Sequence, residues 1–160
     1  MSAAQALLDE YGESHRNPTN KAIHWVCVPL IYWSTVGLVW SIPAGPLDAL
    51  FSGPAAAYGN WASVGVILSL IWFFRMSVSL GVGLTLWSGL MLFLYQLVET
   101  GVTLPLYQLC LAVFLVAWAG QFVGHKIEGK KPSFLKDIQF LLVGPMWLMH
   151  FIYRKMGIAY

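Results

Sequence analysis

Charged side chains are scarce in this sequence. They make up 10% of its 160 residues, whereas hydrophobic residues make up 58%. A soluble globular domain carries about 25% charged residues, so we expect most of the outer surface of this protein to face lipid. The formal net charge of +2 is also too small for the basic surface with which proteins bind nucleic acid. The composition therefore predicts a membrane-embedded protein, with residues 1–160 forming a single domain and with no nucleic-acid partner.

Cysteine motifs and a cleavable leader are lacking as well. Cys27 and Cys110 each stand inside an apolar run, with neither a CxxC pair nor a disulfide framework, so we interpret both as small core residues. The N-terminal segment is polar and acidic and lacks the basic region of a signal peptide, so we expect it in the mature protein. Its mixture of apolar and acidic residues predicts a short amphipathic helix against the membrane or the helix bundle, with a frayed polar tail as the alternative.

The sequence contains several long apolar runs. Residues 22–42, 55–74, 80–98 and 104–123 are each apolar over about the 20 residues that a helix needs to cross a bilayer. Backbone groups in lipid must bond to one another, so these runs are expected to be helices. The second and third runs are separated only by residues 75–79, which predicts a tight antiparallel hairpin. The predicted fold class is thus an all-α integral membrane protein with four transmembrane helices.

A fifth apolar run, residues 138–153, is shorter and contains Pro145, which kinks a helix. If this run crossed the membrane, Arg154 and Lys155 would emerge on the face opposite to the other basic residues. Because basic residues favour the cytoplasmic side, we expect the run to re-enter the membrane or to lie at its interface. The N-terminus is expected in the cytoplasm, on the side of the remaining lysines and arginines: Arg16, Lys21, Arg75, Lys126, Lys130, Lys131 and Lys136.

The four histidines are distributed unevenly across this topology. His15 precedes the first helix, His24 lies in its first turns, and His125 ends the fourth helix, so all three fall near one membrane face. His150 joins them only if the fifth run folds back.

Polar neighbours accompany these histidines at helical spacing. Asn17 and Pro18 are a good N-cap and first residue for a helix, which would set Asn20 and His24 four residues apart on one face. Residues Gln121, His125 and Glu128 follow the i, i+4, i+7 spacing of one helical stripe. The glycines beside this stripe, at positions 120 and 124, would allow another helix to pack closely.

A metal ion would explain why so many polar groups collect near the membrane. Such groups are costly there and usually have a partner or a function. Imidazole is a ligand for iron, zinc, copper and nickel, and two histidines with one carboxylate hold iron in non-haem oxygenases. The spacing alone leaves other readings open, because HExxH and HxxxH pairs are lacking: His24 could be a core histidine bonded to Asn20, and Glu128 could pair with a nearby lysine.

Three segments together resemble the motifs of a known family. They are HRNPTNKAIH at residues 15–24 followed by Val28-Pro29, QFVGHKIEGKKP at residues 121–132, and QFLLVGP at residues 139–145. In this order they resemble the fungal-type 2-hydroxy fatty acid dioxygenases, a family of small multi-pass membrane proteins formerly catalogued as a domain of unknown function.

The resemblance implies a ferrous-iron enzyme that shortens a 2-hydroxy fatty acid by one carbon with molecular oxygen. His15, His24 and His125 match the motif histidines and become the candidate catalytic and metal-binding residues. His150 is a fourth candidate ligand, at a position where a glutamate is expected in fungal members. Candidates for positioning these ligands or for binding substrate are Asn17, Asn20, Lys21, Gln121 and Glu128, and Lys126 or Lys130 could attract the substrate carboxylate.

Three alternatives share the same sequence features. The first is another lipid-active metalloenzyme, such as a zinc hydrolase or a hydroxylase. The second is a haem protein with two axial histidines, and the third is a non-enzymatic scaffold or lipid-binding module. The short chain fits a bacterial inner membrane, or the endoplasmic reticulum if the protein is eukaryotic. The sequence gives no indication of oligomeric state.

Overall fold

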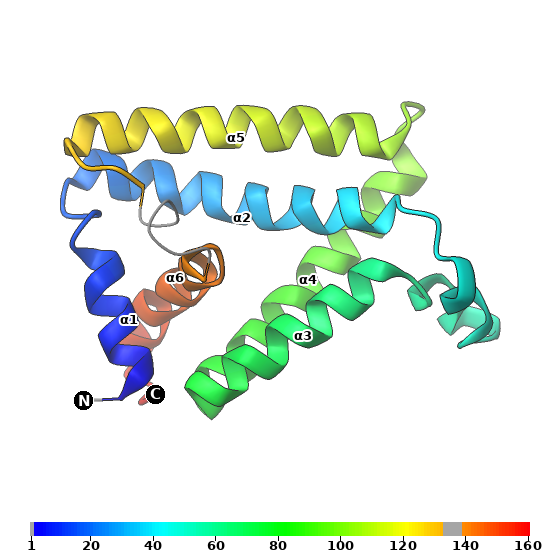
Figure 1. Ribbon diagram of the computed structural model, residues 1–160, viewed down its shortest axis with the longest axis horizontal. Coiled ribbons are helices and arrows are strands. Elements are labelled where there is room, and N and C mark those ends of the chain that lie inside the picture. The colour runs from blue at the N-terminus through cyan, green and yellow to red at the C-terminus, as the bar shows by residue number, and fades with distance from the viewer. Residues whose placement is uncertain (1, 133–138) are drawn as a thin grey trace.

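The computed structural model of the protein describes residues 2–132 and 139–160. Within these ranges the chain is helical and has no strand (Figure 1). The helices are α1 (Ala3–Gly12), α2 (Pro18–Trp40), the short 3-10 helices η1 (Gly45–Ala49) and η2 (Gly53–Tyr58), α3 (Trp61–Met76), α4 (Val78–Gly101), α5 (Leu106–Glu128) and α6 (Phe140–Met156). The all-α prediction is confirmed for the part of the chain described. Lys136 and residue 138, where the fifth apolar run was expected to begin, lie outside it.

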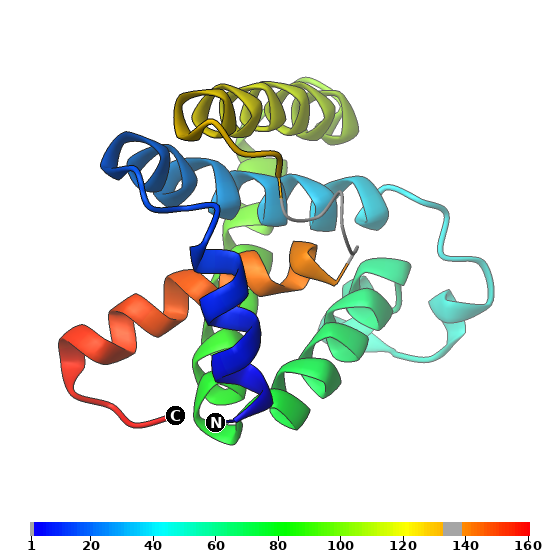
Figure 2. The same ribbon diagram turned by 60° about the vertical axis from the view of Figure 1, so that its left-hand side comes forward.

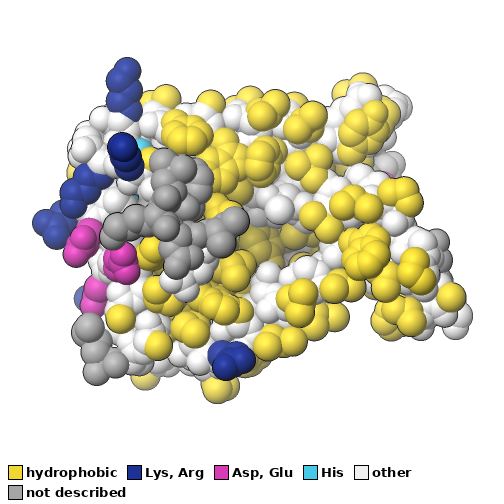
Figure 3. Space-filling model, viewed as in Figure 1, with side chains coloured by type: hydrophobic (Ala, Val, Ile, Leu, Met, Phe, Trp, Pro, Cys, Tyr) yellow, Lys and Arg dark blue, Asp and Glu magenta, His cyan; other side chains and the backbone are white. Residues whose placement is uncertain are grey.

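Three described helices, α2, α4 and α5, are long and apolar enough to cross a membrane. Their outer faces keep large side chains exposed, with Leu86 and Val116 each 73% exposed, and Figure 3 shows hydrophobic side chains over most of the face in view. The predicted crossing at residues 55–74 is not confirmed, because residues 55–58 belong to η2 and α3 begins only after the cap residue Asn60. With 16 residues, α3 is roughly 24 Å long, which is less than the ~30 Å of a hydrocarbon core.

Helices α2 and α5 form a closely packed antiparallel pair (Figure 1). The contacts are reciprocal. A Cβ atom on Gly37 of α2 would lie 2.3 Å from Cys110 Sγ of α5, and one on Gly120 of α5 would lie 2.8 Å from Cys27 Sγ of α2. Both cysteines are buried and free, as expected for small core residues. The predicted close packing at Gly120 is therefore confirmed, with glycine and cysteine alternating across the seam.

Helices α3 and α4 form the predicted tight hairpin. Ser77 alone connects them: it ends α3, and its hydroxyl oxygen accepts a hydrogen bond from the Leu80 N–H (3.3 Å) at the start of α4. This pair runs obliquely to α2 and α5 in both ribbon views (Figures 1 and 2). The arrangement leaves a groove between α2, α3, α5 and α6.

The middle of helix α6 is buried inside the protein, whereas Leu141 and the residues from Arg154 to Met156 are exposed. Every residue from Val143 to His150 is buried, and α6 packs against α1, α2 and α4. A helix segment that is hydrophobic on all sides needs such a position; the re-entrant or interfacial placement of the whole run stays a prediction. The predicted N-terminal helix is confirmed as α1, which buries Ala4, Leu8 and Tyr11 and crosses α6 (Figure 2).

Candidate metal centre

Three of the four histidines come together at one end of the α2–α5 pair. His15 lies in the link between α1 and α2, His24 in the second turn of α2, and His125 in the last turn of α5. Their ring centroids are 4.3 to 4.9 Å apart, and all three side chains are buried. One nitrogen from each ring lies within 4.8 Å of the others. The arrangement can offer three nitrogen ligands to one ion.

Local sequence explains how the chain reaches this arrangement. Asn17 caps α2, because its side-chain oxygen accepts hydrogen bonds from the N–H groups of Thr19 (2.9 Å) and Asn20 (3.4 Å). Pro18 is the first helical residue, as its fixed φ and missing N–H favour. The helix therefore begins where the sequence predicted, and the link before it places His15 beside His24.

Backbone carbonyls fix the orientation of two of the imidazole rings. The Nδ1–H of His15 donates to the Tyr11 carbonyl (2.6 Å), and the Nδ1–H of His24 donates to the Asn20 carbonyl (2.9 Å). A neutral imidazole has one N–H and one lone pair, so each Nε2 atom presents a lone pair. These two Nε2 atoms lie 2.9 Å apart, too close for a porphyrin plane between them. Two facing lone pairs repel unless a cation or a proton lies between them.

His125, whose ring centroid lies 4.9 Å from those of His15 and His24, carries an unsatisfied nitrogen. Its Nδ1 atom is buried and has no hydrogen-bond partner, although buried polar atoms normally have one. Burial, followed by the neighbouring His24, lowers the pKa of His15 to about 3, so this ring stays neutral at physiological pH. Neutral imidazole is the form that binds iron, zinc, copper and nickel. The residues present thus fit a transition-metal ion held by three imidazoles.

Glu128 holds the link before α2 rather than contributing to this cluster. Its two carboxylate oxygens accept hydrogen bonds from the Arg16 N–H (2.9 Å), the Asn17 N–H (2.8 Å) and the Asn20 side-chain amide (3.0 Å). Across the described residues, the group able to hold an ion consists of the three histidines without a carboxylate. The donor set therefore differs from the two-histidine, one-carboxylate pattern considered from the sequence.

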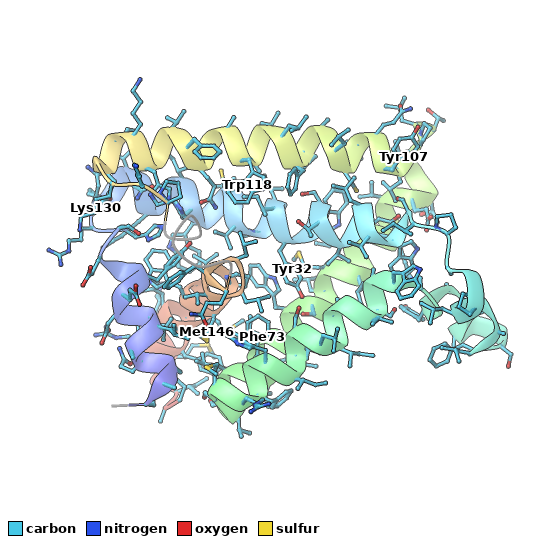
Figure 4. The ribbon with its side chains drawn as sticks, in the orientation of Figure 1. Tyr32, Phe73, Tyr107, Trp118, Lys130 and Met146 are labelled. Atoms are coloured by element: carbon cyan, nitrogen blue, oxygen red, sulfur yellow. The ribbon has the colours of Figure 1, made fainter. Side chains whose placement is uncertain are left out.

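The other polar candidates lie around the cluster. Asn20 is fully buried and also donates to the Ser14 carbonyl (3.1 Å). Gln121, one turn before His125, is buried and reaches the His24 ring. Lys21 is half-buried in the first turn of α2, and Lys126 is exposed. Lys130, labelled in Figure 4, donates to the Glu13 carbonyl (2.9 Å).

His150 is not brought into the cluster. Its Nδ1 atom is hydrogen-bonded to the hydroxyl of Tyr160, and its ring packs against Phe151 and Tyr160. The α6 residue that reaches the site is Trp147, whose ring lies 5.1 Å from that of His15. Three residues at 1.5 Å each place His150 roughly 4.5 Å further along the helix axis.

Sequence reasoning missed two aromatic residues. The Tyr11 ring stacks on His15 with centroids 4.1 Å apart and an interplanar angle of 16°, and Trp147 packs edge-on against Tyr11 at 5.5 Å. Tyr11 falls within the N-terminal segment predicted as an amphipathic helix, and Trp147 falls within the fifth apolar run. The four-residue spacing of Tyr11 and His15 was the available signal, since it permits the ring contact and the carbonyl bond together.

An apolar groove of about 560 Å³ leads away from the histidines. Tyr11, Gln121 and His125 line one end, and Val39 and Ala62 line the other. Its wall is formed by one face of α2 together with α3, α5 and α6. Figure 3 shows the surface hollowed between these helices, and Figure 4 shows Tyr32 and Trp118 beside the space. The histidine cluster thus lies at one end of this apolar groove.

Comparisons with known proteins agree with this picture. No solved structure matches the chain. The chain is similar to the 2-hydroxy-palmitic acid dioxygenase MPO1 of Saccharomyces cerevisiae, with 27% identity over 155 residues, covering 96% of this chain and 81% of the yeast protein. Residues 1–156 match the model of the family described as 2-hydroxy-palmitic acid dioxygenase Mpo1-like. Because this match extends over nearly the whole chain, the protein belongs to the Mpo1-like family.

Proposed function

We propose that this protein is a ferrous-iron dioxygenase that shortens a 2-hydroxy fatty acid by one carbon, with iron held by His15, His24 and His125. One observation carries the proposal: two buried Nε2 lone pairs face each other at 2.9 Å, beside an unpartnered nitrogen of His125. Family membership and the name of the yeast relative supply the reaction. Iron, the substrate and molecular oxygen are proposed together.

The residues of the chain have separate tasks in this proposal. The carbonyls of Tyr11 and Asn20 hold the Nδ1 protons, so that both Nε2 lone pairs stay directed at the ion. Tyr11 and Trp147 cover His15 and exclude water. The amide of Gln121, beside His24, is placed to hydrogen-bond a substrate oxygen, and Lys21 and Lys126 attract the carboxylate. When bound, ferrous iron supplies the redox chemistry with which molecular oxygen cleaves the bond between the carboxyl carbon and its neighbour.

We further propose a multi-pass membrane location, with the N-terminus in the cytoplasm. The α2, α4 and α5 helices are suited to lipid, and a fatty acid dissolved in the bilayer could enter the groove from the side. The yeast relative is a eukaryotic protein, which gives no support to the bacterial inner membrane suggested by chain length.

Elemental analysis of detergent-purified protein tests the metal. We expect near-stoichiometric iron in the wild type and its loss in His24→Ala and His125→Ala, because each variant removes one of three ligands. His150→Ala is the matched control, since His150 lies outside the cluster, and it should keep its iron. Oxygen uptake with 2-hydroxypalmitic acid should follow the iron content.

Zinc is the alternative that the donor set favours, because three histidines also form catalytic zinc sites. Stoichiometric zinc without oxygen uptake would replace the dioxygenase by a hydrolase acting on lipid. Full oxygen uptake in His125→Ala would remove the histidine cluster from the mechanism altogether.

A further inference from the structure

The groove and the histidine cluster are continuous. His125 belongs to both, and Tyr11 and Gln121, which lie against the other histidines, line the groove beside it. Beyond them the α2 wall is formed by the apolar side chains of Val28, Ile31 and Val36. A ligand with a polar head at the histidines would therefore have to place an apolar tail along α2. A volume of about 560 Å³ lies within the range of roughly 300–1,000 Å³ for sites that bind small molecules.

The length of the groove matches one acyl chain. The α2 residues along it run from Val28 to Val39, which corresponds to roughly 17 Å at 1.5 Å per residue. One leaflet of a bilayer, about half of the ~30 Å hydrocarbon core, is as deep as a lipid tail is long, ~15 Å. The groove thus has the dimensions of a single extended tail.

Gly65 of α3 leaves a gap in the far wall. The α3 positions that line the groove are Ala62, Gly65, Val66 and Ser69, whose i, i+3, i+4, i+7 spacing defines one helix face. A Cβ atom on Gly65 would have nothing within 4 Å, whereas Ala62 and Val66 are buried against Val36 of α2. Val36 is twelve residues beyond His24, or roughly 18 Å along the helix.

We propose that the groove holds the acyl chain of the substrate lengthwise, and that the missing side chain at Gly65 sets the longest chain that fits. The substrate class rests on the function proposed above, whereas the groove and its gap are features of the fold. A side chain at position 65 would occupy the space that the end of a long tail fills. A short tail, which ends before this level, would be unaffected.

Gly65→Leu tests this proposal against Gly89→Leu. Gly89 is also an exposed glycine in the interior of a helix, with nothing within 4 Å of an added Cβ, but it does not line the groove. Binding of 2-hydroxydecanoic and 2-hydroxypalmitic acids to the purified protein is measured by displacement of a fluorescent fatty acid, and turnover by oxygen uptake. Gly65→Ala is a milder second variant, because its methyl group fills less of the groove than a leucine side chain does. Alanine also favours the helix over glycine.

We expect Gly65→Leu to weaken binding of 2-hydroxypalmitic acid by about tenfold or more, since each methylene that loses its burial costs about fourfold. Binding of 2-hydroxydecanoic acid should stay unchanged, Gly65→Ala should shift in the same direction by less, and Gly89→Leu should match the wild type. Equal effects on short and long acids, or none on either, would overturn the proposal. If Gly65→Leu changes the chain-length dependence of binding but the wild type shows no turnover, the groove binds acyl chains and the dioxygenase proposal fails. If turnover is normal and the chain-length dependence of binding is unchanged, the dioxygenase proposal stands and the role of Gly65 is rejected.

Discussion

At the scale of single residues, the candidate metal centre depends on where protons are held. An imidazole can rotate and exchange its proton between two nitrogens, so three neighbouring histidines do not by themselves form a metal site. In this protein the carbonyls of Tyr11 and Asn20 bind the Nδ1–H groups, which leaves both Nε2 atoms as ligands. Orientation of this kind by neighbouring groups strengthens metal binding in general. The backbone of α1 and α2 therefore takes part in the site as much as the side chains do.

Glu128→Gln distinguishes a positioning role from a ligand role. The glutamine keeps the size of the side chain but directs an NH₂ group at the N–H group of Arg16 or Asn17. In the wild type the Glu128 carboxylate accepts a hydrogen bond from each of these N–H groups. We expect iron affinity to fall about 10- to 100-fold, the usual effect of losing a group that orients a ligand, with full occupancy restored by excess iron. Competition with a chelator measures this. Glu99→Gln, at the exposed end of α4, is the control, and iron that cannot be restored would make Glu128 a ligand.

Local residue patterns predicted which histidines lie together, but not which side chains surround them. The spacing of Asn17, Pro18, Asn20 and His24 fixes a helix start, and this local signal was confirmed. Trp147 lies more than a hundred residues from His15, and the contact between them depends on how α1 and α6 cross. No local pattern encodes such a crossing. The sequence pattern likewise predicts His150 and not Trp147 as a site residue, because the rotation of α6 about its axis is decided by its packing.

At the scale of helices, the α2–α5 pair creates the site. His24 lies near the start of α2 and His125 near the end of α5, so only antiparallel packing brings them together. The distance between the two helices is set by small residues. Beside the site, a Cβ atom on Gly124 would lie 2.4 Å from Asn20 Oδ1.

Gly124→Ala should therefore move the two helices apart. We expect the protein to lose about 1–3 kcal/mol of stability, as is typical when an extra carbon is forced into a packed core, and to bind iron more weakly because Asn20 would shift. Thermal unfolding in detergent, with and without iron, measures both effects. Gly89→Ala, with open space around the new methyl group, should be neutral or slightly stabilising. Equal melting temperatures for the two variants would show that the close approach at Gly124 is unimportant.

Hydropathy predicted which segments are helices but not what surrounds each one. The apolar run at residues 55–74 includes Gly59 and Asn60, whose turn and cap geometry shorten α3 to 16 residues. Averaging over a window hides such a boundary. Likewise, α6 is apolar from Phe140 to Met149, yet most of these side chains are buried by α1, α2 and α4. Burial in protein and burial in lipid select the same residues, so composition cannot separate them.

At the scale of the whole molecule, most charged side chains and the histidine cluster lie at the same end. In Figure 3 most of the charged side chains in view lie toward the end where α1, the start of α2 and the end of α5 meet. The groove leads from that end along α2, between hydrophobic surfaces. A fatty acid fits this polarity, with its carboxylate near the basic residues and its tail among apolar side chains. The same asymmetry is what the positive-inside rule uses to predict orientation.

Labelling of introduced cysteines tests the crossing and the orientation together. Lys131 follows α5 at the end with the histidines, and Ala56 lies in η2, which follows the other end of α2; both residues are exposed. Cys27 and Cys110 are buried and should react little. In sealed vesicles with the cytoplasmic side outward, we expect an impermeant maleimide to label Lys131→Cys at once and Ala56→Cys only after detergent. The reverse pattern would keep the crossing but invert the orientation, and simultaneous labelling of both would mean that α2 and α5 do not span the bilayer.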